Sequence, residues 1–167
     1  MSWRVTADAL LFDLDGTLVD SHASIVAGWT GWAERYEADL ATLLALMPGR
    51  PGIEVMRQVR PDLPDSVHAR EEAALTAAEI ADVARVVAMP GAAALLGALP
   101  ADRWAVVTAC TRELALARLG AAGLPVPAVL IGSDSVPVGK PDPAGYLAAA
   151  KELDISPRRS VVIEESL

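Results

Sequence analysis

The chain alternates short, wholly apolar runs with longer segments of helical periodicity. Four runs of four or five residues have at most one polar end residue, which is typical of strands buried on both faces of a parallel sheet. These predicted strands are 9–13, 104–108, 128–131 and 160–163. Helical patterns lie between the later runs, at about 91–99, 111–122 and 143–153. This order predicts right-handed crossovers and a doubly wound, Rossmann-like α/β sheet.

The stretch 21–88 breaks this alternation and contains no convincing strand. Its patterns predict four helices separated by proline and glycine, near 22–36, 38–46, 51–59 and 65–88. We therefore expect an all-helical cap domain at 21–88, inserted after the first strand. The α/β catalytic core would be formed by 1–20 and 89–167.

Composition narrows the class of protein. A hydrophobic fraction of 53% in 167 residues supplies a core, and 14 basic against 22 acidic residues give a net charge of −8. This charge argues against binding to nucleic acid or to an anionic membrane surface. Cys110 is the only cysteine, which excludes an intramolecular disulfide and a cysteine metal cluster. Because no apolar stretch has the length of a signal peptide or membrane span, we expect a cytoplasmic protein.

Polar residues collect where the predicted strands end. In open α/β sheets, ligands bind beyond the carboxyl ends of the strands, near the point where the strand order reverses. The residues at those ends are Asp13, Asp15, Thr108, Lys140, Glu164 and Glu165. They come from separate segments, so the sequence predicts a single polar site on one rim of the sheet.

The sequence Asp13-Leu-Asp15-Gly16-Thr17 follows the first strand directly. Side chains two apart on an extended segment point the same way, so both carboxylates can face one cavity. A magnesium ion suits such oxygen ligands. One carboxylate can then attack phosphorus while the other moves a proton. Gly16 would allow a sharp turn and Thr17 would offer a hydroxyl to a phosphate, whereas an isolated Asp-X-Asp is more often a solvated acidic turn.

Thr108 and Lys140 supply donors to the same rim. The Thr108 hydroxyl and the amides of Ala109 and Cys110 can hold an anion, although such a threonine alone equally caps the next helix. Lys140 is one of two lysines in the chain and lies in a Gly-Lys-Pro-Asp-Pro turn. A lysine in a stiff loop beside acidic residues can neutralise phosphate and carboxylate charge, whereas taken alone it equally reads as a solvated turn lysine.

In this order and spacing, the motifs resemble those of the haloacid dehalogenase superfamily along nearly the whole chain. The resemblance implies that Asp13 is the nucleophile and Asp15 the general acid/base. It implies that Thr108 and Lys140 bind the transferring phosphoryl group. It further implies a magnesium ion held by Asp13, Asp15 through its backbone carbonyl, and the fourth-motif acids Glu164 and Glu165.

Within the superfamily, the insertion looks like the small mobile cap of the beta-phosphoglucomutase-like branch. Segments 29–36 and 48–51 are similar to bacterial sugar-phosphate and glycerol-phosphate phosphatases, which implies that Arg50 reaches the substrate from the cap. The insertion contains no lysine, which excludes the Schiff-base mechanism of the phosphonate-cleaving relatives. Ile25 stands where the mutase branch carries a histidine. Hydrolysis is therefore favoured over a mutase reaction.

Two departures from the family pattern count against activity. Glu165 stands where the family usually has Asp, and the extra methylene moves the carboxylate by about 1 Å, a misplacement that can lower a rate about 10²-fold. The sequence also stops at Leu167, where relatives continue with another helix and strand, so we expect a form truncated after the fourth strand.

These observations predict a magnesium-dependent phosphatase that hydrolyses a small phosphorylated metabolite, a sugar or polyol phosphate, through a phospho-aspartate. One alternative is a catalytically weak remnant that binds phosphate or a metabolite. The other is a phosphotransferase or mutase that passes the phosphoryl group to a sugar. The sequence leaves the substrate and the oligomeric state open.

Overall fold

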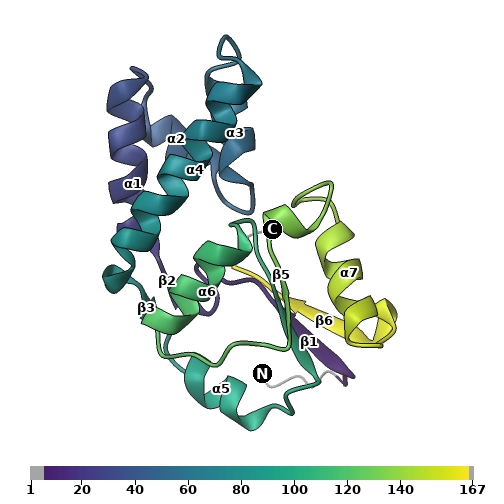
Figure 1. The fold of residues 1–167 in the computed structure, drawn as a ribbon. Coiled ribbons are helices and arrows are strands. Elements are labelled where there is room, and N and C mark those ends of the chain that lie inside the picture. Colours follow the sequence, from purple (N-terminus) through teal and green to yellow (C-terminus); the bar gives the residue numbers. More distant parts are fainter. Residues whose placement is uncertain (1–5, 166–167) are drawn as a thin grey trace.

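A parallel sheet forms the centre of the structure, a computed structural model that describes residues 6–165 (Figure 1). Its strand order is β5-β4-β1-β6, so β1 is central and pairs with β4 and β6. The strands are β1 (Ala9–Phe12), β4 (Trp104–Val107), β5 (Val129–Ile131) and β6 (Ser160–Ile163). All four predicted strands are confirmed, with ends within one residue of the prediction.

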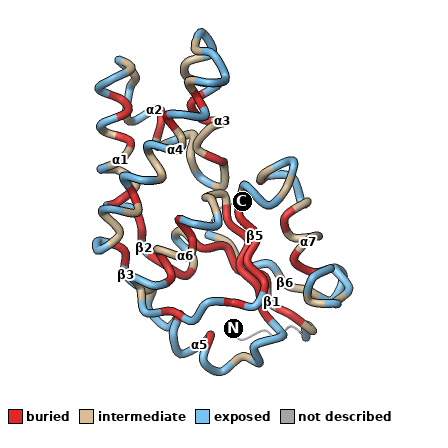
Figure 2. Tube along the Cα trace, in the orientation of Figure 1, coloured by how far each residue is buried: buried red, intermediate tan, exposed pale blue. Residues whose placement is uncertain are grey.

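Helices cover both faces of this sheet, which confirms the doubly wound α/β class (Figure 1). They are α5 (Ala92–Ala98), α6 (Arg112–Ala121) and α7 (Ala144–Glu152). Because side chains alternate along a strand, Trp104 and Val106 pack with α5 and α6, while Ala105 and Val107 pack with α7. Figure 2 shows the resulting buried centre.

The insertion has a hydrophobic cluster of its own. It contains α1 (His22–Arg35), α2 (Leu40–Leu46), α3 (Gly52–Val59) and α4 (Asp65–Ala81). Trp29 and Trp32 meet edge to face, with ring centroids 5.7 Å apart, and are buried among residues of α2 and α3. The helices therefore pack on one another as a unit beside the core (Figure 1).

The prediction of one helix over 65–88, with no strand in this region, is wrong at its end. Helix α4 stops at Ala81 and a short 3₁₀ turn follows at Val83–Arg85. The chain then forms β3 (Val87–Ala88), which pairs antiparallel with β2 (Val19–Asp20). A strand of two residues is too short to show the alternation of apolar and polar positions that identifies a strand. The sequence before β3 has the periodicity of a helix, so the pattern predicts that the helix continues.

No helix within residues 6–165 combines the length and the apolar character that crossing a bilayer requires.

Candidate active site

The carboxyl ends of the strands hold the predicted site residues in fixed backbone positions. Asp13 follows β1, and its N–H donates to the Ile163 carbonyl at 2.9 Å. Thr108 follows β4, and its N–H donates to the Ile131 carbonyl at 2.9 Å. Glu164 follows β6, whereas Lys140 comes from the loop between β5 and α7. The backbone hydrogen bonds of the parallel sheet thus extend to Asp13 and Thr108, two of the predicted site residues.

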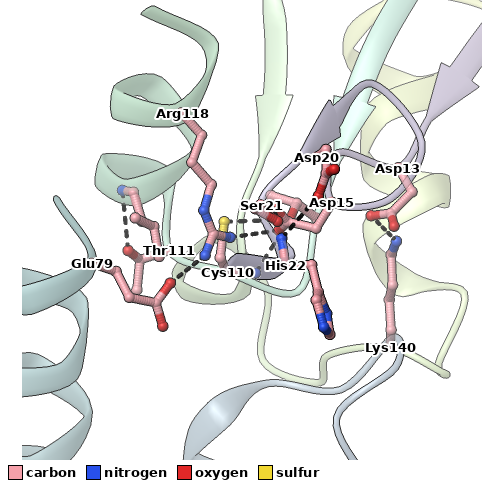
Figure 3. Close-up of polar contacts among 12 residues, drawn as sticks. Asp13, Asp15, Asp20, Ser21, His22, Glu79, Cys110, Thr111, Arg118 and Lys140 are labelled. Carbon is pink, nitrogen blue, oxygen red and sulfur yellow. Dashed lines mark hydrogen bonds and ion pairs between the residues drawn. The ribbon is translucent and has the colours of Figure 1, made fainter. Parts of the chain in front are cut away.

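Lys140 joins two of the predicted acidic residues. Its Nζ lies 2.7 Å from Asp13 Oδ1 and 2.7 Å from Glu164 Oε1 (Figure 3 shows the pair with Asp13). Burial raises the pKa of the Asp13 carboxyl to about 7, and the Lys140 ammonium acts in the opposite direction. Tyr146, on α7, donates its hydroxyl proton to Glu164 and presents its ring to Lys140 Nζ, 5.2 Å from the ring centroid. Lys140 therefore balances a buried negative charge.

Although burial alone would raise it, contact with Lys140 and Tyr146 holds the pKa of the Glu164 carboxyl below its usual value. For the Tyr146 hydroxyl, burial and the neighbouring carboxylate both raise the pKa. Tyr146 lies outside the predicted motifs. The only hint of its role in the sequence is its position in the first turn of α7, three residues after Pro143.

A tight turn follows Asp13 and depends on glycine. Gly16 has φ +79°, and its N–H donates to the Val19 carbonyl at 2.8 Å. A Cβ at Gly16 would lie 2.9 Å from Cγ of Glu165, because the Glu165 side chain lies across the turn. Thr17 donates its hydroxyl proton to Glu165 Oε2 at 3.0 Å. Glu165 is therefore placed next to the first motif, while Thr17 is turned to Glu165.

Asp15 lies apart from the Asp13–Lys140 pair and has partners of its own (Figure 3). The Ser21 hydroxyl donates to its Oδ1 at 2.7 Å, and Arg118 Nη1 lies 2.6 Å from its Oδ2. The other terminal nitrogen of Arg118 contacts Glu79 on α4. Arg118 and Glu79 belong to none of the motifs. The sequence indicates a role for Arg118 only through its position on α6. Arg118 lies on the same buried face of this helix as Leu114, and a charged side chain that is buried there requires a partner.

The second motif forms a compact turn at the end of β4. Thr108 is buried, and its hydroxyl oxygen accepts the Cys110 N–H at 3.2 Å. Ala109 and Cys110 are half-buried. Burial raises the pKa of the Cys110 thiol to about 12, so this side chain stays a protonated, weakly polar group.

A cavity of about 280 Å³ lies between the sheet edge and the helical insertion. Among the predicted residues, it is lined by Asp13, Asp15, Gly16, Arg50, Thr108, Ala109, Cys110 and Glu165. Thr17, Lys140 and Glu164 are not part of its lining. Arg50 stands at this cavity, but its Nη1 donates to Gln58 of α3 at 2.7 Å. The insertion adds Trp29, Glu72, Leu75 and Glu79 to the wall.

The oxygen donors fit a hard divalent cation by type. Asp13 offers a carboxylate at the end of β1, and Glu164 and Glu165 offer carboxylates at the adjacent end of β6. Asp13 is buried, so its carboxylate requires a nearby positive charge. Within residues 6–165, however, no three acidic, histidine or cysteine side chains converge as a preformed metal cage. Lys140 occupies the space between Asp13 and Glu164, so these carboxylates are held together before any ion binds.

Comparison with known proteins identifies the family of this chain. The family model of haloacid dehalogenase-like hydrolases matches residues 7–167. Hexitol phosphatase A of Escherichia coli (strain K12) is 37% identical over 158 residues, which cover 93% of this chain and 73% of that protein. Validoxylamine A 7'-phosphate phosphatase of Streptomyces hygroscopicus subsp. limoneus is 35% identical, over 93% of this chain and 76% of that protein.

Among solved structures, a hydrolase from Pseudomonas syringae superposes with a TM-score of 0.81 at 27% identity. The match covers 93% of this chain and 74% of that one. The fold, the order of the motifs and these similarities lead to one conclusion: the chain belongs to the haloacid dehalogenase-like hydrolases and is an enzyme of the phosphoric monoester hydrolase class.

Proposed function

We propose that this enzyme is a magnesium-dependent phosphatase of sugar or polyol phosphates that acts through a phospho-aspartate on Asp13. One observation carries the proposal. Asp13 and Asp15 line the same cavity, and Lys140 holds Asp13 by one oxygen only, Oδ1. The second carboxylate oxygen of Asp13 is the nucleophile in this proposal. Two of the relatives named above are a hexitol phosphatase and a validoxylamine A 7'-phosphate phosphatase, and these names support the proposed substrate class.

In the first step, an Asp13 oxygen attacks phosphorus and the bond from phosphorus to the ester oxygen breaks. Asp15 gives a proton to the departing alkoxide. In the second step, water attacks the phospho-aspartate and passes a proton to Asp15. The bond between phosphorus and Asp13 breaks, inorganic phosphate leaves, and the Asp13 carboxylate is restored. Thr108 and Lys140 bind the phosphoryl oxygens and offset their charge.

A magnesium ion fits this proposal through the carboxylates of Asp13, Glu164 and Glu165 and the backbone carbonyl of Asp15. When bound, the ion would neutralise charge on the phosphoryl oxygens and orient the phosphoryl group. Lys140, which contacts both Asp13 and Glu164, keeps two of these carboxylates at the same place.

We also propose that residues 21–88 act as a cap over a core formed by 1–20 and 89–167. The loop before α3 touches the loop that carries Lys140. Pro51 lies so close to Gly139 that a Cβ at Gly139 would be only 2.7 Å from Pro51 Cγ. The cap side supplies both apolar and acidic walls to the cavity. Closure of such a cap excludes water from the first step.

The lining of the cavity favours a substrate whose far end is uncharged and rich in hydroxyl groups. Glu72 on α4 and Asp20 at the cap junction line the cavity and can accept hydrogen bonds from hydroxyl groups, as can the oxygen of Glu79 that Arg118 does not contact. The two arginines of the lining are engaged, Arg118 by two carboxylates and Arg50 by Gln58. A carboxylate or second phosphate at this end would face acidic groups. The volume lies near the lower limit of about 300 Å³ for small-molecule pockets.

The direct test is phosphate release from a panel of phosphomonoesters. We expect a hexitol phosphate or glycerol phosphate to be cleaved with a kcat/KM about tenfold or more above that of phosphoglycolate, because the latter brings a carboxylate to an acidic wall. Chelation by EDTA should abolish release, and added magnesium should restore it. Equal activity with EDTA would contradict the metal requirement, and preference for phosphoglycolate would contradict the proposed substrate class.

Glu165→Asp tests whether the longer side chain limits metal binding. We expect this variant to reach half-maximal activity at a magnesium concentration about threefold or more lower, because octahedral magnesium tolerates little misplacement of a ligand. The measurement is phosphate release against magnesium concentration. Glu113→Asp, an exposed change on α6, serves as the control. A rise in the required magnesium concentration would show instead that Glu165 is already suited to its position across Gly16.

A further inference from the structure

Arg118 connects the helical insertion with the residue that we propose as general acid/base. Its Nη1 lies 2.6 Å from Asp15 Oδ2, and its Nη2 contacts Glu79 Oε2. The Arg118 side chain is 3% exposed and that of Glu79 is 6% exposed. We call Asp15, Arg118 and Glu79 the Arg118 bridge. Figure 3 shows how it runs from α4 across α6 to the turn after β1.

Stability alone does not account for this bridge. One guanidinium lies between two carboxylates, of which Glu79 is buried and Asp15 is 24% exposed at the cavity, so the bridge carries a net negative charge that is largely removed from solvent. Burial raises the pKa of Glu79, although Arg118 opposes that change. Replacing a buried ion triad with apolar residues of similar volume is often neutral or stabilising. Charges in such a place therefore suggest a role in geometry.

Both carboxylate oxygens of Asp15 depend on the insertion. Oδ1 accepts from Ser21, the residue that joins β2 to α1. Oδ2 contacts Arg118, whose other nitrogen is held by α4. If α4 moves away, Arg118 loses one of its two partners, and its guanidinium can turn away from Asp15.

We propose that Arg118 is a positioning residue, which makes the orientation of the Asp15 carboxylate depend on whether α4 is docked on the core. Docking places Glu79 on one side of the guanidinium and thereby fixes the other side against Asp15. Proton transfer by Asp15 is then efficient only while the insertion covers the cavity. The inference rests on the proposed function, because it takes Asp15 as the acid of the first step.

Arg118→Met and a pair of substrates test the catalytic consequence. We expect kcat/KM for a hexitol phosphate to fall about 10²-fold, the usual contribution of a positioned acid. For p-nitrophenyl phosphate we expect a fall of less than about tenfold, because a nitrophenolate leaves without a proton. Arg118→Lys should recover part of the loss, since one ammonium can still reach Asp15. Glu113→Ala, on the exposed face of α6, is the control. Equal losses on both substrates would indicate a merely structural role and overturn the proposal.

Hydrogen exchange tests the coupling without any activity. In Glu79→Ala, which leaves Arg118 and Asp15 in place, we expect amides of α4 and of residues 14–21 to exchange about fivefold faster together. Faster exchange in α4 alone would overturn the proposal. If the unaltered enzyme releases no phosphate from any substrate, the proposed function fails, yet this exchange experiment still decides whether Asp15 responds to α4.

Discussion

Asp13→Asn is expected to lower kcat for a hexitol phosphate by about 10³-fold or more, the scale of loss when a covalent nucleophile is removed. An amide oxygen is a weak nucleophile, and the Asn side chain has nearly the same shape as Asp. The nitrogen of Lys140, 2.7 Å from Oδ1, can still contact the amide oxygen, so the fold should persist. The measurements are phosphate release and, with substrate labelled in the phosphoryl group, acid-quenched labelling of the protein.

The labelling experiment separates the proposed covalent route from direct attack by water. The unaltered enzyme should carry label after quenching, and Asp13→Asn should carry none. Asp102→Asn is the matched control, because Asp102 is exposed and precedes β4 at the opposite end of the sheet. Retention of a tenth or more of the original rate in Asp13→Asn would contradict the role of Asp13.

Lys140→Met is expected to lower the free energy of unfolding at pH 7 by about 2 kcal/mol, because Asp13 and Glu164 lose the cation that both contact. The loss stays below that of an unrelieved buried charge, since the pKa of Asp13 is already about 7 and its carboxyl can take up a proton. The substitution removes the ammonium that contacts both Asp13 and Glu164 while keeping much of the side-chain volume. Activity should be lost as well, since the phosphoryl oxygens lose their cationic partner. Urea unfolding followed by circular dichroism measures the first effect, and phosphate release measures the second.

The chain provides a matched control for this variant. Its other lysine, Lys151, lies exposed on α7. Lys151→Met should change the free energy of unfolding by no more than about 0.5 kcal/mol, as is usual for surface substitutions. The same unfolding free energy in Lys140→Met and Lys151→Met would show that the buried contacts of Lys140 contribute nothing to stability.

The parallel sheet of this fold was predictable because each of its strands is marked by a local run of apolar residues. Three of the four parallel strands, β1, β4 and β5, are apolar runs that are largely buried on both faces, as Trp104–Val107 illustrates. Strand β6 is an equally apolar run, although its residues are only half-buried or exposed. The antiparallel pair β2–β3 was not predictable in this way. Val19–Asp20 and Val87–Ala88 are stabilised by pairing with a partner that lies far along the chain. A local pattern does not report such pairing.

The same distinction between local and long-range contacts separates the predictable from the unpredictable residues of the candidate site. Asp13, Thr108 and Glu164 follow strands directly, so the geometry of a parallel sheet alone is enough to bring them to one edge. The contact between Arg118 and Glu79 depends on how α4 packs against α6, which no spacing along the chain expresses. Arg50 shows a further limit: it lies at the cavity, as the resemblance implied, yet its guanidinium contacts Gln58.

The short β2–β3 pair has a consequence for how such an enzyme changes over evolution. It places Val19 directly opposite Ala88, so the chain leaves the core and returns to it at neighbouring points. The entropy of closing a loop grows slowly with its length, by only about 0.6 kcal/mol for each doubling. Provided that Ser21 and Glu79 keep their contacts with Asp15 and Arg118, the rest of the chain between those two points can therefore be lengthened, shortened or exchanged at little expense to the sheet. Mutations that broaden or alter substrate choice can accumulate there while the residues that break the phosphate ester stay as they are.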